Sequence, residues 1–411
     1  MEIPEKADRP LRVGVAGLGV GAASLLPAIA ASRYAELVAG ADTDGVTLGR
    51  FAERFPSART HGSVEALCSD PTVEVVWIAT PTIWHASHAI TCAAHGKHVV
   101  VSKPFTVDVD EARRVVEACD VAGVKLVVGH SLGFSPAILR MAQLSMDGDG
   151  PGAVRAIQMM AFTDWMLLPR TPDELDEGKA GGLLHRQSPH QVDAARLLGG
   201  GLVESVAACV GDWMPARPAP GFFTAMLRFV NGTVATISHN GYGFFVGAEL
   251  PAWGEDRGIS GLALAERNVL RARIEAGETD ERARKSDMRI GGATPLFGRP
   301  DAPRQWLPMH LGLTVVSCER GDMRHAPEGV YVYDRHGRRE VAAASDSDWF
   351  ATTELDELYH ALRAGTPLVR DGLWGLATVE VCEAIRRAAT SKELVRLRHQ
   401  VPVRHGAYRL I

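Results

Sequence analysis

A short glycine-rich segment near the N-terminus constrains the fold of this chain more than any other feature. Residues 12–22 read RVGVAGLGVGA, an apolar run that is followed by a tight turn and then by a helical pattern. Gly17 permits the turn, Gly19 lets the backbone come close to a pyrophosphate, and the helix offers its first N–H groups to the phosphates. Ala22 replaces the third glycine of G-x-G-x-x-G and still allows close helix–strand packing. The segment predicts a dinucleotide site formed by Gly17, Leu18, Gly19 and Val20.

An acidic residue follows the second predicted strand. Residues 36–41 read as that strand, and it ends in Asp42, which lies 25 residues after Gly17 (42 − 17). A carboxylate at this position accepts hydrogen bonds from the adenosine ribose hydroxyls. Asp44 comes next, and no arginine stands beside it in the sequence. Because two carboxylates would repel a 2′-phosphate, we expect the cofactor to be NAD rather than NADP.

Strands and helices alternate over the first 130 residues. The apolar runs 73–79, 97–101 and 125–128 read as buried strands, and segments 46–55 and 109–122 read as helices. This alternation predicts an α/β domain, a Rossmann-type doubly wound parallel sheet with right-handed crossovers, over residues 1–130.

The pattern changes in the second part of the chain, residues 131–411. Two β-rich runs flank Asn231-Gly232, which is a strong signal for a hairpin turn. Residues 249–308 read as an insertion with one charged helix between Ala263 and Arg284. Further strands and two final helices follow, so this part is predicted to be an α+β domain.

The composition excludes several classes of function. A net charge of −5 gives no reason to expect nucleic acid or an anionic membrane as a partner. Six scattered cysteines without a C-x-x-C pair fit reduced thiols in a cytoplasm, and no apolar run is long enough to span a bilayer. His85 and His88 lack a third ligand at a useful spacing, so no metal site is expected. The net charge, the cysteine pattern and the lack of a long apolar run together favour a cytoplasmic protein with a small-molecule substrate.

Lys103 is the first candidate catalytic residue. It follows the strand at residues 97–101, at the carboxyl end where open α/β sheets bind their ligands. Pro104 comes next, restricts the lysine backbone and permits a cis peptide bond. A solvated surface charge is the alternative reading of this lysine.

His190 is the second candidate. Ser188 reads as a helix N-cap, Pro189 as the first helical residue and Gln191 as the partner in a capping box. His190 would then lie in the first helical turn, where the helix dipole disfavours the imidazolium and leaves a neutral base. The alternative is a histidine that only hydrogen-bonds near a helix start. Asp193, one turn later, either holds the ring or faces solvent.

Together these residues resemble the Gfo/Idh/MocA oxidoreductase family. The glycine turn, Lys103-Pro104 and a GG…H-x-x-D block that ends in His190 and Asp193 occur in the family's order. A further motif is Ala79-Thr80-Pro81 with His85. The resemblance implies that Lys103 and His190 are catalytic, and that Thr80, Pro81, His85 and Lys103 bind the cofactor. It also implies an open, mainly antiparallel C-terminal sheet and a homodimer or homotetramer.

Two residues depart from the family pattern. Ser102 stands where a glutamate usually precedes the lysine, and Arg186 replaces an aspartate four residues before the catalytic histidine. A guanidinium pairs with a carboxylate in a bidentate manner, so Arg186 favours an anionic substrate. The expected substrate-binding residues are Arg170, Arg186, Gln187 and Asp193.

Several stretches, including residues 162–165, 169–176, 186–193 and 315–322, resemble the phthalate 4,5-cis-dihydrodiol dehydrogenase branch of the family. This branch implies oxidation of a carboxylated cyclic cis-dihydrodiol to a catechol with NAD. Two alternatives stay open: a sugar, inositol or polyol dehydrogenase of the same family, and a non-catalytic NAD-binding sensor, which Ser102 and Arg186 would suit.

Overall fold

The structure is a computed structural model. It describes residues 6–129, 131–250, 264–289, 310–343 and 349–404, together with Leu262 and Gly292. The chain forms two compact units. The first comprises Met1–Ser131, Glu281–Ala302 and Asp348–Leu376, and the second comprises Leu132–Asp280, Pro303–Ser347 and Ala377–Ile411.

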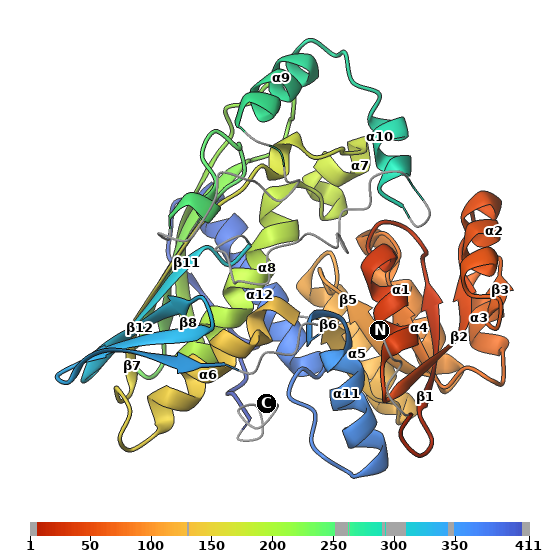
Figure 1. Ribbon diagram of the computed structural model, residues 1–411, viewed down its shortest axis with the longest axis horizontal. Helices are drawn as coiled ribbons and strands as arrows, with labels where there is room; N and C mark the ends of the chain where they lie inside the picture. The colour runs from red at the N-terminus through yellow and green to blue at the C-terminus, as the bar shows by residue number, and fades with distance from the viewer. Residues whose placement is uncertain are drawn as a thin grey trace. The chain divides into compact units, whose positions relative to one another are not determined.

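The first unit contains a parallel sheet of six strands in the order β3-β2-β1-β4-β5-β6 (Figure 1). This is the order of a doubly wound dinucleotide-binding fold, as the alternating pattern predicts. The strands are β1 (Leu11–Ala16), β2 (Ala35–Ala41), β3 (Arg59–His61), β4 (Val75–Ile78), β5 (His98–Ser102) and β6 (Leu126–Gly129). Its helices are α1 (Ala22–Ala31), α2 (Gly45–Arg54), α3 (Val64–Ser69), α4 (His85–Ala94), α5 (Val109–Ala122), α10 (Glu281–Asp287) and α11 (Trp349–Arg363).

The core of this unit explains why its strands are easy to recognise. Every residue of β4 and β6 is buried, because helices cover both faces of a parallel sheet. Leu355 and Leu358 of α11 are fully buried in the same cluster as residues of β1 and α1. Strand β3 is short, polar and partly exposed, so it carries no apolar signal in the sequence and was not predicted.

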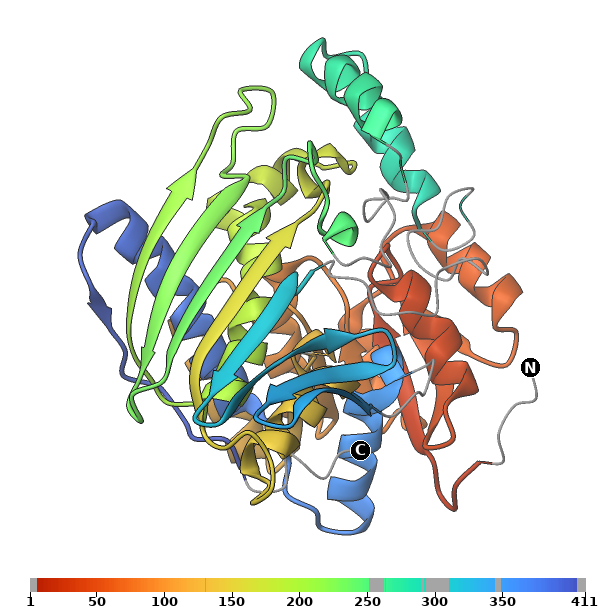
Figure 2. The same cartoon turned by 60° about the vertical axis from the view of Figure 1, so that its left-hand side comes forward.

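The second unit contains a mixed, mostly antiparallel sheet of nine strands, as expected (Figure 2). Their order is β14-β13-β12-β11-β7-β10-β9-β8-β15, and only β7 and β10 pair in parallel among the described pairs of this sheet. The predicted hairpin joins β9 to β10 through Asn231-Gly232. The strands are β7 (Val154–Phe162), β8 (Val203–Gly211), β9 (Phe222–Phe229), β10 (Val234–Asn240), β11 (Leu313–Cys318), β12 (Gly321–Ala326), β13 (Gly329–Asp334), β14 (Gly337–Ala342) and β15 (Val395–Arg396).

Helix α8 packs against β7, β9 and β10 and carries most of the candidate site residues of this unit. The unit's helices are α6 (Pro136–Met146), α7 (Pro172–Leu175), α8 (Gly182–Gly199) and α9 (Leu264–Glu275), and the long α12 (Gly372–Ser391) begins in the first unit and ends in the second.

The predicted start of the helix at Ser188 is wrong. Helix α8 starts at Gly182 with Gly181 as its N-cap, so His190 lies eight residues after its first residue (190 − 182). Pro189 is inside the helix rather than at its first position. An interior proline loses a backbone hydrogen bond, so the sequence rule places it at a start, but here burial of nearly the whole helix outweighs that loss. The argument that a helix N-terminus keeps His190 neutral therefore does not apply.

The prediction of one charged helix between Ala263 and Arg284 is also wrong. This region forms two helices, α9 and α10, that are separated by residues 276–280. The N–H of Glu278 bonds to the carbonyl of Arg273, which closes α9. Residues 251–261, 263, 290–291 and 293–308 of the predicted insertion lie outside the described residues.

Candidate active site

The glycine turn of the first unit is packed against the loop that follows β4. Gly17 has a φ of +87°, and a Cβ atom there would lie 2.7 Å from the backbone nitrogen of Thr80. Only glycine fits such a position without strain. Two family motifs, the glycine turn and the Thr80-Pro81 segment, therefore meet at Gly17.

Gly19 has a different reason to be glycine. A Cβ atom at Gly19 would meet nothing within 4 Å. Packing inside the protein would therefore tolerate a side chain at this position. No side chain caps the following helix α1, and its first turn holds no acidic residue. Its first N–H groups thus face no carboxylate of their own turn. This turn fits the pyrophosphate of a dinucleotide, which needs close backbone approach and N–H donors.

Asp42 joins the end of β2 to the glycine turn. Its Oδ2 accepts a hydrogen bond from the N–H of Leu18 at 2.8 Å, and its Oδ1 accepts from the N–H of Asp44 at 3.0 Å. A carboxylate oxygen has two acceptor positions, so the half-buried Asp42 keeps capacity for ribose hydroxyls. The predicted ribose ligand is therefore also a structural link.

No arginine stands beside Asp44 in the sequence, but one lies beside it in the structure. Arg289, just after α10, places Nη1 3.7 Å from Oδ2 of Asp44. Both residues belong to the first unit, and both side chains are more than two-fifths exposed. The arginine comes from 245 residues further along the chain (289 − 44), so inspection of the neighbouring sequence could not find it.

His85 ties together two loops at the carboxyl edge of the parallel sheet. Its ring is buried, with Nε2 2.8 Å from the carbonyl oxygen of Thr80 and Nδ1 2.8 Å from that of Pro104. Carbonyl oxygens only accept, so both contacts are hydrogen bonds when the ring carries both protons. The Thr80 hydroxyl contacts Nδ1 of His88 at 3.0 Å, and Pro81 is exposed.

Lys103 follows β5 and is half-buried, and its peptide bond to Pro104 is cis. The preceding Ser102 accepts a hydrogen bond of 2.9 Å from Nε1 of Trp77 on β4. The serine that replaces the family's usual glutamate therefore has a defined partner beside the lysine. Trp77 was not predicted to have this role, because an indole in an apolar strand reads as core.

In the second unit, Arg186 and His190 lie one turn apart on α8, four residues from each other and therefore on one face. Gln187 lies between them and is buried, and so is His190. Oε1 of Gln187 is 3.0 Å from Nδ1 of His310, and the His310 ring centre is 5.5 Å from that of His190. His310 was not among the predicted site residues. A lone histidine before a strand gives no signal of its own in the sequence.

Arg170 and Arg186 meet at one glutamate. Their guanidinium groups lie 3.9 and 3.7 Å from Oε1 of Glu174, a residue of α7. Arg170 is buried and lies 3.8 Å above the ring of Trp165. Burial lowers the pKa of Arg170 to about 9; Glu174 opposes the shift, and Arg186 and the buried Arg217 add to it. The cluster is thus rich in positive charge, which favours an anionic ligand.

Asp193 does not face solvent, which was one of its two possible roles. It is fully buried, and its Oδ1 accepts a hydrogen bond from the Thr378 hydroxyl at 3.2 Å. The Thr378 hydroxyl also accepts from Nη1 of Arg196 at 2.7 Å. The Asp193 side chain therefore points from α8 into the packed interior, where it contacts Thr378.

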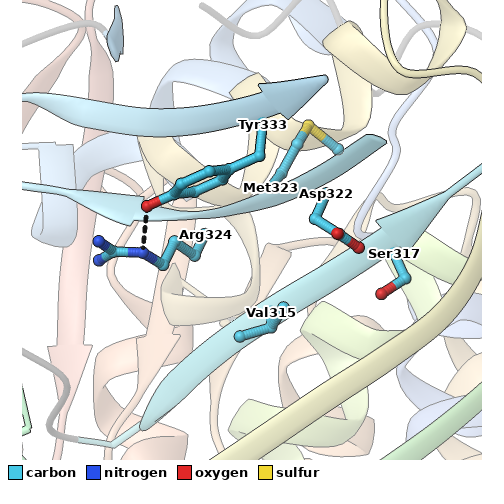
Figure 3. Close-up of a pocket in the computed structure, with 6 residues that line it drawn as sticks. All are labelled: Val315, Ser317, Asp322, Met323, Arg324 and Tyr333. Atoms are coloured by element: carbon cyan, nitrogen blue, oxygen red, sulfur yellow. Dashed lines mark hydrogen bonds between the residues drawn. The ribbon is translucent and has the colours of Figure 1, made fainter. Parts of the chain in front are cut away.

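A hollow of about 380 Å³ lies on the nine-stranded sheet (Figure 3). It is lined by Val315, Ser317, Asp322, Met323, Arg324 and Tyr333. Val315 pairs with the exposed Gln158, whereas the neighbouring Ile157 points to the other, buried face of the sheet. The hollow is thus on the outer face of the sheet and holds none of the predicted site residues.

No group of three or more potential metal ligands comes together in the described part of the chain. None of the helices in the described ranges has the length and apolar character needed to cross a bilayer.

Comparisons with known proteins identify the family. Residues 11–130 match a model described as an oxidoreductase family with an NAD-binding Rossmann fold, and residues 140–243 match the GFO/IDH/MocA C-terminal domain. The chain is 35% identical over 379 residues to 1-carboxy-3-chloro-3,4-dihydroxycyclohexa-1,5-diene dehydrogenase of Comamonas testosteroni, covering 91% of this chain and 94% of the relative.

Two further relatives agree with this result. A crystal structure of a protein from Bordetella bronchiseptica RB50 has a TM-score of 0.85 and 30% identity, covering 95% of this chain and all of the other. D-xylose 1-dehydrogenase (NADP(+)) 2 of Haloferax volcanii is 33% identical over 187 residues, which is 45% of this chain and 55% of the relative. The chain is a member of the Gfo/Idh/MocA oxidoreductase family and an NAD(P)-dependent dehydrogenase.

Proposed function

We propose that this dehydrogenase oxidises a carboxylated cyclic cis-dihydrodiol, of the phthalate 4,5-dihydrodiol type, to a catechol. The observation that carries the proposal is the position of Arg186, one helical turn before His190 on the same face of α8. A guanidinium there suits a substrate that bears a carboxylate near the reacting hydroxyl. The Comamonas relative supports the same class, since its name specifies a carboxylated dihydroxycyclohexadiene.

The reaction removes two hydrogens from one carbinol group. Bound NAD(P) supplies the acceptor for the hydride, at the nicotinamide C4. His190 would take the hydroxyl proton, and by the family resemblance Lys103 would stabilise the developing alkoxide and bind the nicotinamide ribose. The carbinol becomes a ketone, and the resulting hydroxydienone tautomerises to the catechol. Because the catechol is aromatic, its formation makes the overall free-energy change of the oxidation favourable.

Arg186 and Arg170 would hold the substrate carboxylate. Arg186 is the more accessible of the two, with a side chain 29% exposed, whereas Arg170 is 7% exposed and held over Trp165. Oε1 of Glu174 lies 3.9 Å from Arg170 and 3.7 Å from Arg186, which are longer distances than those of a close charge-assisted hydrogen bond. Gln187 and Asp193 are buried side chains of α8 and would hold in place the helix that carries Arg186.

We propose NAD as the preferred cofactor. The two carboxylates at the end of β2, Asp42 and Asp44, favour a free ribose diol over a 2′-phosphate. Arg289 beside Asp44 weakens this discrimination without removing Asp42 from the glycine turn.

We also propose a homodimer or homotetramer, on the basis of the family resemblance. Light scattering coupled to size-exclusion chromatography gives the subunit number directly.

The experiment that tests the function is NADH formation by the purified protein with three kinds of substrate: a carboxylated cis-dihydrodiol, inositol and simple sugars. We expect turnover of the carboxylated diol, with the others about 10-fold to 150-fold slower in kcat/KM, because one lost bidentate ion pair is worth about 1.5–3 kcal/mol. Activity confined to neutral polyols would support the sugar or polyol alternative. No turnover of any diol, despite NAD binding, would indicate a non-catalytic sensor.

A further inference from the structure

A second histidine lies beside the proposed catalytic base. His310 precedes β11 by three residues (313 − 310) and belongs to the same unit as α8. The ring centres of His310 and His190 are 5.5 Å apart, and the rings are tilted by 46°. Two imidazoles therefore lie side by side on one face of α8.

The position of His310 is fixed by two buried glutamines of α8. Gln187 Oε1 lies 3.0 Å from Nδ1 of His310, and Gln191 Nε2 donates to the carbonyl of Leu311 at 3.2 Å. Gln191 also donates to the carbonyl of Ser238 on β10 at 3.0 Å. These glutamines are one helical turn apart, on either side of His190 in the sequence. Their hydrogen bonds hold residues 310–311 against the helix.

The contact with Gln187 sets the polarity of the His310 ring. An amide oxygen only accepts, so Nδ1 of His310 is the donor in this contact. In the neutral ring Nε2 then carries the lone pair and accepts a hydrogen bond from a hydroxyl. His310 thus combines a fixed orientation with an acceptor nitrogen, which is what recognition of a hydroxyl requires.

We infer that His310 binds the second hydroxyl of the vicinal diol, while His190 acts on the hydroxyl that is oxidised. Two imidazoles side by side match two oxygens on adjacent ring carbons, whereas a substrate with one hydroxyl would use only one of them. The inference rests on the proposed function, since it takes the substrate to be a vicinal diol. His310 is then a residue that determines specificity for diols over simple alcohols.

The test uses stable aromatic ligands that resemble the product. Binding of 3,4-dihydroxybenzoate, 3-hydroxybenzoate and 4-hydroxybenzoate to the NAD-loaded enzyme is measured by calorimetry. His310→Ala should weaken 3,4-dihydroxybenzoate and one of the two monohydroxy isomers by about tenfold, the effect of one hydrogen bond of about 1.4 kcal/mol, and leave the other isomer unchanged. His190→Ala should show the opposite preference between the isomers.

Two controls separate recognition from a structural role. Gln187→Ala keeps the imidazole but frees its position, so it should give the same pattern with a smaller effect. In turnover of the cis-dihydrodiol, His310→Ala should raise KM about tenfold with a small change in kcat, whereas His190→Ala should lower kcat. Thermal melting of each variant verifies that it is folded.

The inference is overturned if His310→Ala weakens all three ligands equally, or none of them, while wild type binds the dihydroxy compound. A wild-type enzyme that neither binds 3,4-dihydroxybenzoate nor oxidises the dihydrodiol overturns both this inference and the proposed function. The two failures are therefore distinguishable, because the first appears only in the variants.

Discussion

The two units hold their candidate site residues in different ways. In the first unit the site is built mainly from backbone: Gly17 packs on the Thr80 amide, Asp42 accepts from the Leu18 amide, and His85 contacts two carbonyls. In the second unit the site is built from side chains that meet one another, such as Gln187 with His310 and Arg186 with Glu174. The backbone contacts of the first unit depend little on side-chain identity, whereas the contacts of the second unit depend on which side chains are present.

This difference teaches where substitutions should act. Changes in the first unit should alter NAD(P) binding for any substrate, whereas changes on α8 should alter turnover and substrate preference with little effect on NAD(P). Substitutions in the two units should therefore separate cofactor binding from substrate turnover.

The largest effect is expected for His190→Ala. We expect kcat for the dihydrodiol to fall about 1000-fold, within the range for loss of a general base, while the Kd of NAD stays within about twofold of wild type. Steady-state kinetics and calorimetric NAD titration measure the two quantities. A variant that keeps wild-type turnover would remove His190 from the mechanism.

The next largest effect separates two glycines of one turn. Gly17→Ala should lower the free energy of unfolding by about 2 kcal/mol or more, because φ is positive and the new Cβ meets the Thr80 amide. Gly19→Ala should leave stability unchanged and weaken NAD binding about tenfold, because its Cβ meets only the space that we assign to the pyrophosphate.

Chemical denaturation and NAD titration of both variants measure this contrast. Equal loss of stability in the two variants would contradict the assignment of Gly19 to the cofactor rather than to packing.

A smaller effect on stability is expected when the pH is lowered. Burial lowers the pKa of His325 on β12 to about 3 and that of His185 on α8 to about 4, with Arg386 adding to the second shift. The unfolded state, with a histidine pKa near 6.5, binds more protons, so stability falls as pH drops from about 6.5 towards 4. Burial also lowers the pKa values of His88 and His98 of the first unit, but Glu65 and Glu74 oppose these two shifts.

Hydrogen exchange at pH 7.5 and 5 should therefore show that β12 and α8 lose more protection than β1 and β4. His325→Leu should reduce the loss around β12, since it removes the titrating ring. Equal loss in both units, or earlier loss in the first, would contradict this contrast.

The smallest effect concerns the choice of cofactor. Arg289→Ala should weaken NADP binding by about twofold to fivefold and leave NAD within twofold, because an exposed cation contributes up to about 1 kcal/mol to a nearby phosphate. Asp44→Asn is the matched control and should act in the opposite direction on NADP. Parallel changes in both cofactors would show that Arg289 only supports the fold.

Most of the first unit could be predicted from the sequence because its signals are local. A buried strand, its glycine turn and the next helix are adjacent in the chain, so the sequence alone predicts that Gly17, Asp42, Thr80 and Lys103 lie at strand ends. Arg289 is the exception, and it reaches Asp44 from a distant segment.

The second unit was harder for the same physical reason. His310 lies 120 residues from His190 (310 − 190), and only the order of strands in the sheet brings them together. The start of α8 was misplaced because Pro189 is a stronger local signal than the burial that keeps it inside a helix. Arg186 and Arg170 were predicted to bind the substrate carboxylate, and the structure places both beside Glu174, which was not predicted.

The central claim is that α8 recognises a carboxylated diol, and one measurement tests it most directly. The kcat/KM of wild type and Arg186→Gln is compared for the cis-dihydrodiol acid and for its neutral methyl ester, with NAD at saturation. We predict that wild type prefers the acid by between about 10-fold and 100-fold and that Arg186→Gln reduces this preference to within about threefold. A wild-type enzyme that oxidises the acid and the ester equally well would contradict the account.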